Sequence, residues 1–170
     1  MSPTARIVRV EPMSPDDWAA VRRIYAEGIA TGDATLEREA PDWDHFDRSH
    51  RADCRLVARD GDDVLGWTAV TAYSSRRVYA GVAWESVYVS ATARRRGVGR
   101  ALLEELIPAS EAAGLWALVA GVLAENEASL ALHEAVGFER VGLLRGMGQD
   151  ATGRWRDVVL LERRSEVVGR

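Results

Sequence analysis

A stretch of arginines and glycines separates an apolar segment from an amphipathic one near the middle of the chain. Arg94, Gly97, Gly99 and Arg100 belong to this stretch, which follows the apolar residues 87–89. A strand, a glycine turn and a helix start together present backbone N–H groups and the positive end of a helix dipole. The glycines also let the backbone approach a ligand without side-chain clashes. The stretch therefore predicts a site for an anionic group.

Two common phosphate-binding motifs do not fit this spacing. A Walker loop needs a lysine after its second glycine, and the chain of 170 residues contains no lysine. A dinucleotide-binding fingerprint needs a third glycine at the position where Leu102 stands. A solvent-exposed arginine run before a helix is the alternative that these residues leave open.

The elements that position the stretch follow from the hydrophobic pattern, which predicts an α/β fold: a mixed sheet covered by helices. Ser14 and Asp17 are spaced to cap the first helix, and Asn126 can cap the last. A strand that begins at Ile7 comes first. The other predicted elements are helices from residue 14, at 42–52, 97–114 and 126–137, and strands at 54–60, 63–73, 80–90, 115–123, 138–148 and 154–163.

Composition and charge narrow the class of protein. Hydrophobic residues make up 47% and charged residues 28%, as in ordinary globular domains. The net charge of −4 argues against a general polyanion binder. A single cysteine, Cys54, fits a reducing compartment, and no apolar run approaches the about 20 residues that span a bilayer. We expect one cytoplasmic domain over residues 1–170, with its core at about 6–163, that binds neither membrane nor nucleic acid.

The spacing of Arg94, Gly97 and Gly99 resembles the pyrophosphate-binding loop of the GNAT acetyltransferase superfamily, whose members bind acetyl-CoA. A second superfamily motif follows about 30 residues later. It consists here of Asn126, Ala128, His133 in the place of a common tyrosine, and Gly137–Phe138. Segments 85–89, 126–138, 142–145 and 153–158 are similar to the branch that contains phosphinothricin and methionine sulfoximine N-acetyltransferases.

The resemblance implies the GNAT fold, a splayed and mostly antiparallel mixed sheet of about seven strands flanked by about four helices. It implies acetyl-CoA as co-substrate, and no cluster in the sequence has metal-ligand spacing. The pantetheine arm is expected along strand residues 86–89 and the pyrophosphate on the glycine loop. The implied cofactor-binding residues are Val87, Tyr88, Val89, Arg94, Arg95, Arg96, Gly97, Val98, Gly99, Arg100 and Asn126.

The resemblance also implies two residues for proton transfer, since an amine must lose a proton before it attacks a thioester. His133 matches a histidine of the branch. Glu85 stands one residue nearer the strand's first valine than the branch glutamate, whose place is taken by Trp84. On a regular strand this shift turns the side chain to the other face, and a β-bulge could restore its aim. Glu85 acting as base through water is favoured, and His133 alone as base, or Glu85 as a surface or substrate-ammonium contact, stay open.

Acceptor binding is expected from residues that match the branch's substrate loop and pocket. Arg76 and Tyr79 match an arginine and a tyrosine of that loop, and an arginine can clamp a carboxylate or phosphinate through two hydrogen bonds. Tyr73 takes an aromatic position, and Leu36 replaces a phenylalanine near the pocket. Trp84 is expected to narrow the pocket and to change its specificity.

Three further residues receive less specific interpretations. His45 and His50 lie in a polar segment and are expected at the surface. Trp155 is expected in the core. In the branch this last hairpin lines a dimer interface, so the resemblance implies a homodimer.

The residues together predict an enzyme that transfers the acetyl group of acetyl-CoA to the α-amino group of a small amino acid or toxic analogue. One alternative is an acetyltransferase for a protein N-terminus or another amine. Another is a non-catalytic acyl-CoA-binding module. A nucleic-acid binder that uses residues 94–100 is disfavoured by the acidic balance of the chain.

Overall fold

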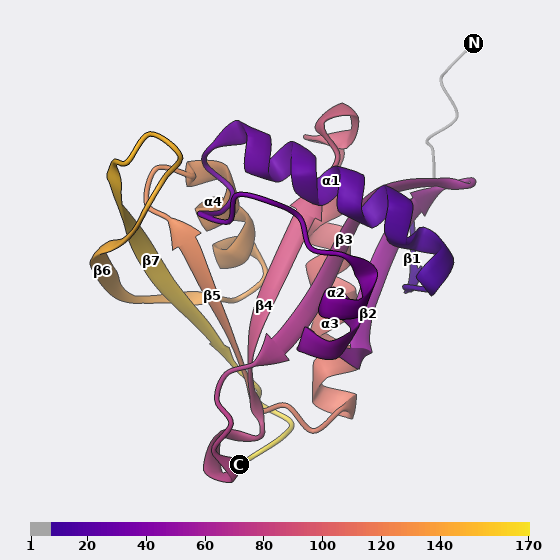
Figure 1. Cartoon of the computed structure of the whole chain (residues 1–170). Coiled ribbons are helices and arrows are strands. Elements are labelled where there is room, and N and C mark those ends of the chain that lie inside the picture. Colours follow the sequence, from indigo (N-terminus) through magenta and orange to yellow (C-terminus); the bar gives the residue numbers. More distant parts are fainter. Residues whose placement is uncertain (1–7) are drawn as a thin grey trace.

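The computed structural model describes residues 8–170, and its elements follow the order predicted from the sequence (Figure 1). Ile7, where the first strand was expected to begin, lies outside the described residues. The strands are β1 Arg9–Pro12, β2 His50–Asp60, β3 Asp63–Ala72, β4 Val82–Val89, β5 Ala117–Leu123, β6 Glu139–Gln149 and β7 Trp155–Arg164. The α-helices are α1 Trp18–Thr31, α2 Trp43–Ser49, α3 Val98–Ala112 and α4 Glu127–Ala135, with short 3₁₀ helices at Pro15–Asp17, Arg77–Tyr79 and Ala91–Ala93.

Within residues 8–170 the strands form one seven-stranded sheet in the order β1-β2-β3-β4-β5-β7-β6. All neighbouring strands are antiparallel except β4 and β5, which run parallel. That parallel pair is hydrogen-bonded only from Val82–Trp84 to Ala117–Val119, and the two strands then diverge, which opens the V visible in Figure 1. The sheet is therefore splayed between β4 and β5, as the sequence predicts.

Helices cover both faces of the sheet and bury separate cores. On one face α1 and α2 pack over β2 and β3, where Val21, Ile24 and Phe46 surround Trp67. On the other face α3 and α4 bury Leu102, Leu106 and Leu130 against the sheet (Figure 1). Because successive side chains of a strand point to opposite faces, each β4 residue is committed to one of these layers.

Helix α2 is shorter than the sequence predicts, whereas the turn after β2 is as predicted. Helix α2 is capped by Asp42, whose side chain accepts from the His45 N–H at 2.8 Å, but it ends at Ser49 instead of reaching Ala52. The backbone turns extended at His50 because residues 50–60 form β2, in which His50 pairs with Thr71 of β3. The turn between β2 and β3 is confirmed, with Gly61 at a φ of 62°.

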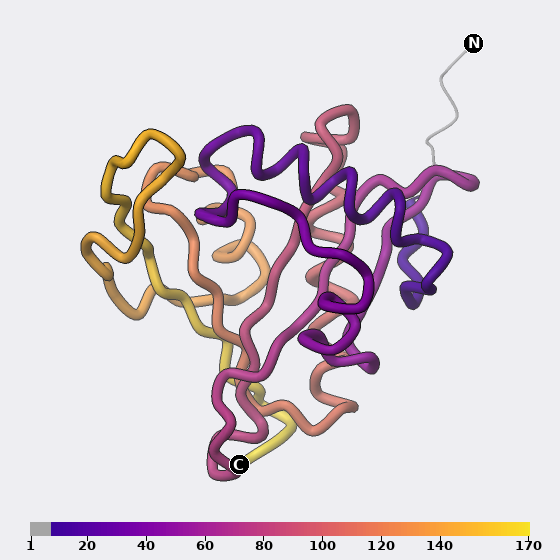
Figure 2. Tube along the Cα trace, viewed as in Figure 1, coloured from indigo at the N-terminus to yellow at the C-terminus, as the bar shows by residue number. Residues whose placement is uncertain are grey.

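The connection after α1, residues 32–42, begins near the β6–β7 hairpin and runs back across the sheet toward α2 (Figure 2). Leu36 lies against Gly148 of β6, where a Cβ would come within 2.7 Å of the leucine side chain. Arg38 donates to the carbonyl of Asp150 at 3.4 Å. Segments more than a hundred residues apart in the sequence thus meet above the point where β4 and β5 diverge.

Candidate active site

The loop between β4 and α3 ends in an open helix N-terminus. Gly97 adopts the left-handed region with a φ of 77°, and α3 begins at Val98. The first N–H groups of a helix have no partner inside it, so those of Val98, Gly99 and Arg100 face outward from the first turn. The helix dipole adds positive potential at the same place. The backbone is arranged as an anion-binding loop requires.

The arginines of this loop fall into two groups. Arg96 lies 3.2 Å from Asp60 and Arg100 lies 2.7 Å from Glu104, so both charges are already balanced. Arg94 and Arg95 are exposed and have no ion-pair partner within residues 8–170. Arg95 also has a φ of 61°, in the left-handed region. Among the described residues it is the sole non-glycine residue with a positive φ. The two unpaired guanidinium groups are those best placed to meet an anion.

The two glycines of the loop have different roles. Nothing lies within 4 Å of a Cβ built on Gly97, whose requirement for glycine comes from its positive φ. A Cβ on Gly99 would come within 2.9 Å of Leu132 in α4, and Gly99 is buried. The missing side chain of Gly99 therefore lets α3 pack against α4, and a contact of its backbone with the cofactor stays a prediction.

Strand β4 has an unpaired edge beyond its last contact with β5. After Trp84 the N–H and C=O groups on that edge have no partner in β5. The side chains of Val87 and Val89 pack into the core beneath α3, and Tyr88 stacks on Trp67 at the opposite face. Only the backbone of residues 87–89 is therefore available to a ligand, and an extended chain can pair with it as another strand would.

A buried carboxylate–imidazole pair lies where β4 leaves β5. His133 Nε2 is 2.5 Å from Glu85 Oε1, and the two side chains are 2% and 1% exposed. The β-bulge that could have restored the aim of Glu85 is absent, because β4 pairs with β3 without a register shift from Ala83 to Val89. Glu85 shares the face of Ala83 and Val87, which α3 and α4 cover, so it reaches His133 on a regular strand. Its interpretation as a surface residue is wrong.

The hydrogen bonds of the pair define where its protons lie. His133 Nδ1 is 2.6 Å from the carbonyl oxygen of Ser129, which can only accept, so this nitrogen donates. Burial by itself lowers the pKa of His133, but the hydrogen bond and charge of Glu85 outweigh it and raise the pKa above its ordinary value of 6.5. A carboxylate oxygen accepts hydrogen bonds, so the contact with Glu85 favours Nε2 as a second donor. Glu85 Oε2 is buried and has no hydrogen-bond partner within residues 8–170.

The predicted acceptor residues form a continuous aromatic ladder on the opposite face. Trp84 stacks on Tyr73 with 5.5 Å between ring centroids, and Tyr73 meets Tyr79 edge-on at 6.0 Å. The exposed guanidinium of Arg76 lies 5.2 Å above the Tyr79 ring. The ladder runs from solvent to Trp84, which is the last β4 residue paired with β5. Tyr73 and Tyr79 also line an open groove of about 540 Å³. Leu36 is not part of the ladder and packs on the β6–β7 hairpin.

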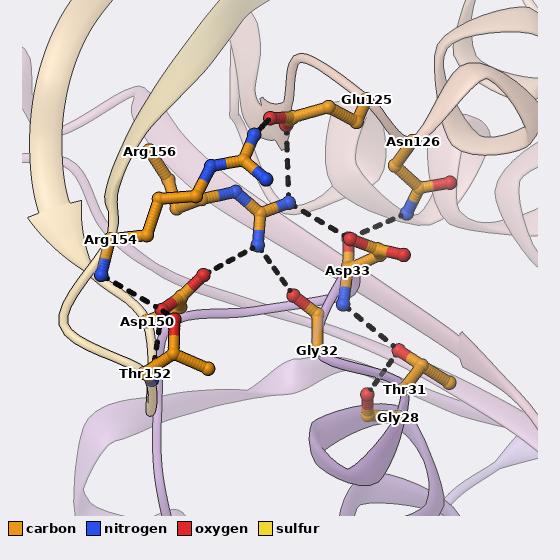
Figure 3. Close-up of polar contacts among 10 residues, drawn as sticks. All are labelled: Gly28, Thr31, Gly32, Asp33, Glu125, Asn126, Asp150, Thr152, Arg154 and Arg156. Carbon is orange, nitrogen blue, oxygen red and sulfur yellow. Dashed lines mark hydrogen bonds and ion pairs between the residues drawn. The ribbon is translucent and has the colours of Figure 1, made fainter.

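Asn126 caps α4 and also reaches across to the loop after α1. Its Oδ1 accepts from the Ser129 N–H at 3.1 Å, which confirms the predicted cap. Its Nδ2 donates to the carbonyl of Asp33 at 3.0 Å. Asp33 belongs to a larger polar network around Arg156 and Asp150, which joins three segments of the chain (Figure 3). Sequence pattern did not predict this network, and Arg156 beside the apolar run 158–161 was the signal that could have indicated it.

Two minor expectations about the surface are corrected. His50 is half-buried, because its ring stacks on Phe46 with centroids 4.0 Å apart, whereas His45 is exposed as expected. Trp155 was expected in the core but is 63% exposed, since it begins β7 beside the β6 edge of the sheet.

Two absences hold for the part of the chain that the structure describes. Residues 8–170 contain no cluster of histidine, cysteine and carboxylate side chains arranged to hold a metal ion. None of their helices combines the length and apolar character needed to cross a membrane.

Comparisons with known proteins agree with this geometry. The model of the acetyltransferase (GNAT) family matches residues 18–138. Phosphinothricin N-acetyltransferase of Alcaligenes faecalis is 38% identical, over 94% of this chain and 81% of that protein. L-methionine sulfoximine/L-methionine sulfone acetyltransferase of Pseudomonas paraeruginosa is 36% identical, over 63% of this chain and 62% of that protein.

A solved structure extends the similarity to three dimensions. The phosphinothricin acetyltransferase of the GNAT superfamily from Sinorhizobium meliloti, in complex with acetyl-CoA, superposes with a TM-score of 0.83. It is 29% identical, and the match covers 92% of this chain and 88% of that one.

Proposed function

The chain belongs to the acetyltransferase (GNAT) family, and on that premise we propose that it transfers the acetyl group of acetyl-CoA to the α-amino group of a small amino acid or toxic analogue. Phosphinothricin and methionine sulfoximine represent the acceptor class, in line with the relatives' activities. The observation that carries the proposal is the buried Glu85–His133 pair at the point where β4 leaves β5. That position gives a proton acceptor access to the gap between the strands.

The chain offers acetyl-CoA two kinds of contact, and the residues fit the molecule. The N–H groups at the start of α3, with Arg94 and Arg95, suit a pyrophosphate. The unpaired edge of β4 over residues 87–89 suits the amide-containing pantetheine arm, which can pair with it as a strand would. Outward N–H groups of this edge also serve to polarise the thioester oxygen. Asn126, at the N-terminus of α4, faces the same gap from its other side.

Glu85 is the residue that receives the amine proton, and His133 positions it. Both ring nitrogens of His133 already have partners, the Ser129 carbonyl and the Glu85 carboxylate, so neither is directed at an acceptor amine. Glu85 Oε2 is unpartnered and can accept one, directly or through a water molecule. The amine nitrogen then forms its bond to the acetyl carbon while the carbon–sulfur bond breaks, and the leaving thiolate takes up the second amine proton to give coenzyme A.

The aromatic ladder provides the acceptor side of the reaction. The exposed Arg76 can clamp a carboxylate or phosphinate through two hydrogen bonds. Trp84, stacked on Tyr73, forms the wall at the mouth of the strand gap and limits the size of an acceptor there. An acceptor held between Arg76 and Trp84 presents its amine to the gap that Glu85 faces from the other layer.

We also propose a homodimer in the cytoplasm. Strand β6 is the edge of the sheet, and its Val141, Leu143 and Met147 are exposed, as is Trp155 on β7. Isolated exposed apolar residues are common, but four on one hairpin beside an open groove suit a second copy of the chain. Analytical ultracentrifugation at two protein concentrations tests the homodimer.

The cytoplasmic location is supported by Cys54, because a buried, free cysteine suits a reducing compartment.

The decisive experiment is acetyl-CoA turnover, read as thiol release, against a panel of acceptors. Phosphinothricin, methionine sulfoximine, methionine sulfone, ordinary amino acids and peptides with free N-termini make up the panel. We expect turnover of the amino-acid analogues and none of the peptides. Turnover of peptides alone would overturn the proposal that the acceptor is a small amino acid. Tight acetyl-CoA binding without any turnover would overturn the proposal that the protein is an enzyme.

A further inference from the structure

Arg156 of β7 is a buried guanidinium that joins three separate segments of the chain (Figure 3). Its Nη1 donates to the Gly32 carbonyl at 2.9 Å and lies 3.3 Å from Asp150 Oδ2. Its Nη2 lies 2.9 Å from Asp33 Oδ1 and 3.1 Å from Glu125 Oε2. The contacts come from the loop after α1, the loop before α4 and the β6–β7 hairpin.

The guanidinium has a strong electrostatic reason to stay in place. Its side chain is 5% exposed, and burying a charge without partners is costly. The hydrogen bonds that Arg156 donates to Glu125 and Asp33 raise its pKa further above the ordinary range. Asp33, Glu125 and Asp150 converge on it, so its removal would leave three carboxylates close together. Arg154 neutralises only Glu125, at 2.6 Å.

The network reaches the two sides of the proposed reaction centre. Asp33, held by Arg156, also accepts from Asn126 Nδ2 through its carbonyl at 3.0 Å. Beyond Asp33 the same loop carries Leu36, whose side chain packs on Gly148. One fixed guanidinium thereby sets the position of Asn126 beside the strand gap and of the loop above it. The exposed Arg154 contacts neither Gly32 nor Asp33 within the described chain.

We propose that Arg156 is a positioning residue, which fixes the loop of residues 32–42 as the upper wall of the acceptor site. This rests on the proposed function and adds to it that the loop, which carries Leu36 and holds Asn126 beside the strand gap, takes part in acceptor binding. The loop must be ordered before an acceptor can meet it, so Arg156 removes that ordering cost from acceptor binding. Loss of the guanidinium therefore weakens acceptor binding more than it slows the bound acceptor's reaction.

The test compares Arg156→Met and Arg156→Lys with Arg154→Met as matched control, which removes a neighbouring arginine that shares Glu125. For Arg156→Met we expect the KM of the acceptor to rise about tenfold or more, with kcat changed by less than about threefold. Arg156→Lys should recover part of the loss, because a lysine keeps the charge without the fork of donors. Arg154→Met should leave the KM of the acceptor within about twofold of wild type.

Amide hydrogen exchange supplies a readout that does not need turnover. In Arg156→Met the amides of residues 32–42 should exchange faster, while those of the core strands β3 and β4 should not change. Asp33→Asn, which keeps Arg156 and loses one ion pair, should show a smaller effect of the same kind and covers the case in which Arg156→Met does not fold.

Each outcome decides a separate question. The positioning role would be overturned if, in Arg156→Met, the amides of residues 32–42 exchanged as fast as in wild type and the KM of the acceptor did not change. Faster exchange with a fall in kcat alone would overturn the assignment of the loop to acceptor binding. If wild type turns over none of the acceptors, the proposed function fails, and the exchange data still decide whether Arg156 holds the loop.

Discussion

His133 Nε2 lies 2.5 Å from Glu85 Oε1 in a buried pair. This contact joins helix α4 to the face of β4 that α3 and α4 cover. The histidine is anchored from behind by the Ser129 carbonyl, so its ring cannot turn without losing a hydrogen bond. The carboxylate keeps one oxygen without a partner. The geometry of the pair is therefore consistent with the roles proposed above, in which His133 orients Glu85 and Glu85 accepts the proton.

Glu85→Gln should lower kcat by about 100-fold or more, because the amide cannot take the amine proton. Gln has the same shape, so acetyl-CoA binding, measured by calorimetry, should change little. Glu105→Gln, an exposed change on α3, is the matched control and should retain wild-type turnover. Wild-type kcat in Glu85→Gln would move the role of base to another group.

His133→Gln should alter the dependence of stability on pH. The pKa of His133 is raised in the folded protein, so its contribution is complete below about pH 6.5 and is lost as the pH rises through the folded value. Urea midpoints from about pH 6 to about pH 9 should thus fall for wild type and fall less for His133→Gln. Parallel curves for the two proteins would contradict the raised pKa.

The double variant Arg94→Ala/Arg95→Ala should raise the KM of acetyl-CoA about tenfold or more, since each lost charge–phosphate contact costs affinity and not chemistry. The kcat at saturating acetyl-CoA should stay near that of wild type. Arg48→Ala removes an exposed arginine of α2 and serves as control. A fall in kcat with an unchanged KM would show that the two arginines do not contact the cofactor.

Trp84→Ala should shift the choice of acceptor toward bulkier amino acids, because it removes the wall stacked on Tyr73. The ratio of kcat/KM between a large and a small acceptor should change by about tenfold, the scale of a few methylene contacts in a pocket. The KM of acetyl-CoA should not change. Trp18→Phe, in the aromatic cluster of α1, controls for loss of an indole elsewhere, and an unaltered acceptor ratio in Trp84→Ala would place the pocket away from Trp84.

His50 should make the protein sensitive to acid. Burial is the main cause that lowers the pKa of His50 to about 4, and the charges of Arg55 and His45 act in the same direction. For a lowered value, stability is complete above about pH 6.5 and is lost as the pH falls toward 4. Urea midpoints at about pH 7 and pH 5 should differ less in His50→Gln than in wild type, whereas the exposed His45→Gln should behave as wild type.

The order of elements could be predicted because it depends on neighbours in the sequence. Period-two and period-3.6 patterns mark strands and helices, and Asn126 and Gly97 mark helix starts by local backbone chemistry. Errors arose where distant residues decide the outcome. The stacking of His50 on Phe46 and the exposure of Trp155 depend on how α2 and β6 pack in the folded chain.

The sequence by itself determined the strand, the glycine turn and the helix of the anion loop, and it named Glu85 and His133 as a candidate pair. Only the tertiary structure decided that the two side chains meet, because the face of β4 that α4 covers depends on the packing of the whole sheet. The same holds for Arg156, whose partners come from positions as much as 124 residues away. Local backbone preferences depend on short segments of sequence, whereas the partners of a buried charge depend on how the helices and the sheet pack together.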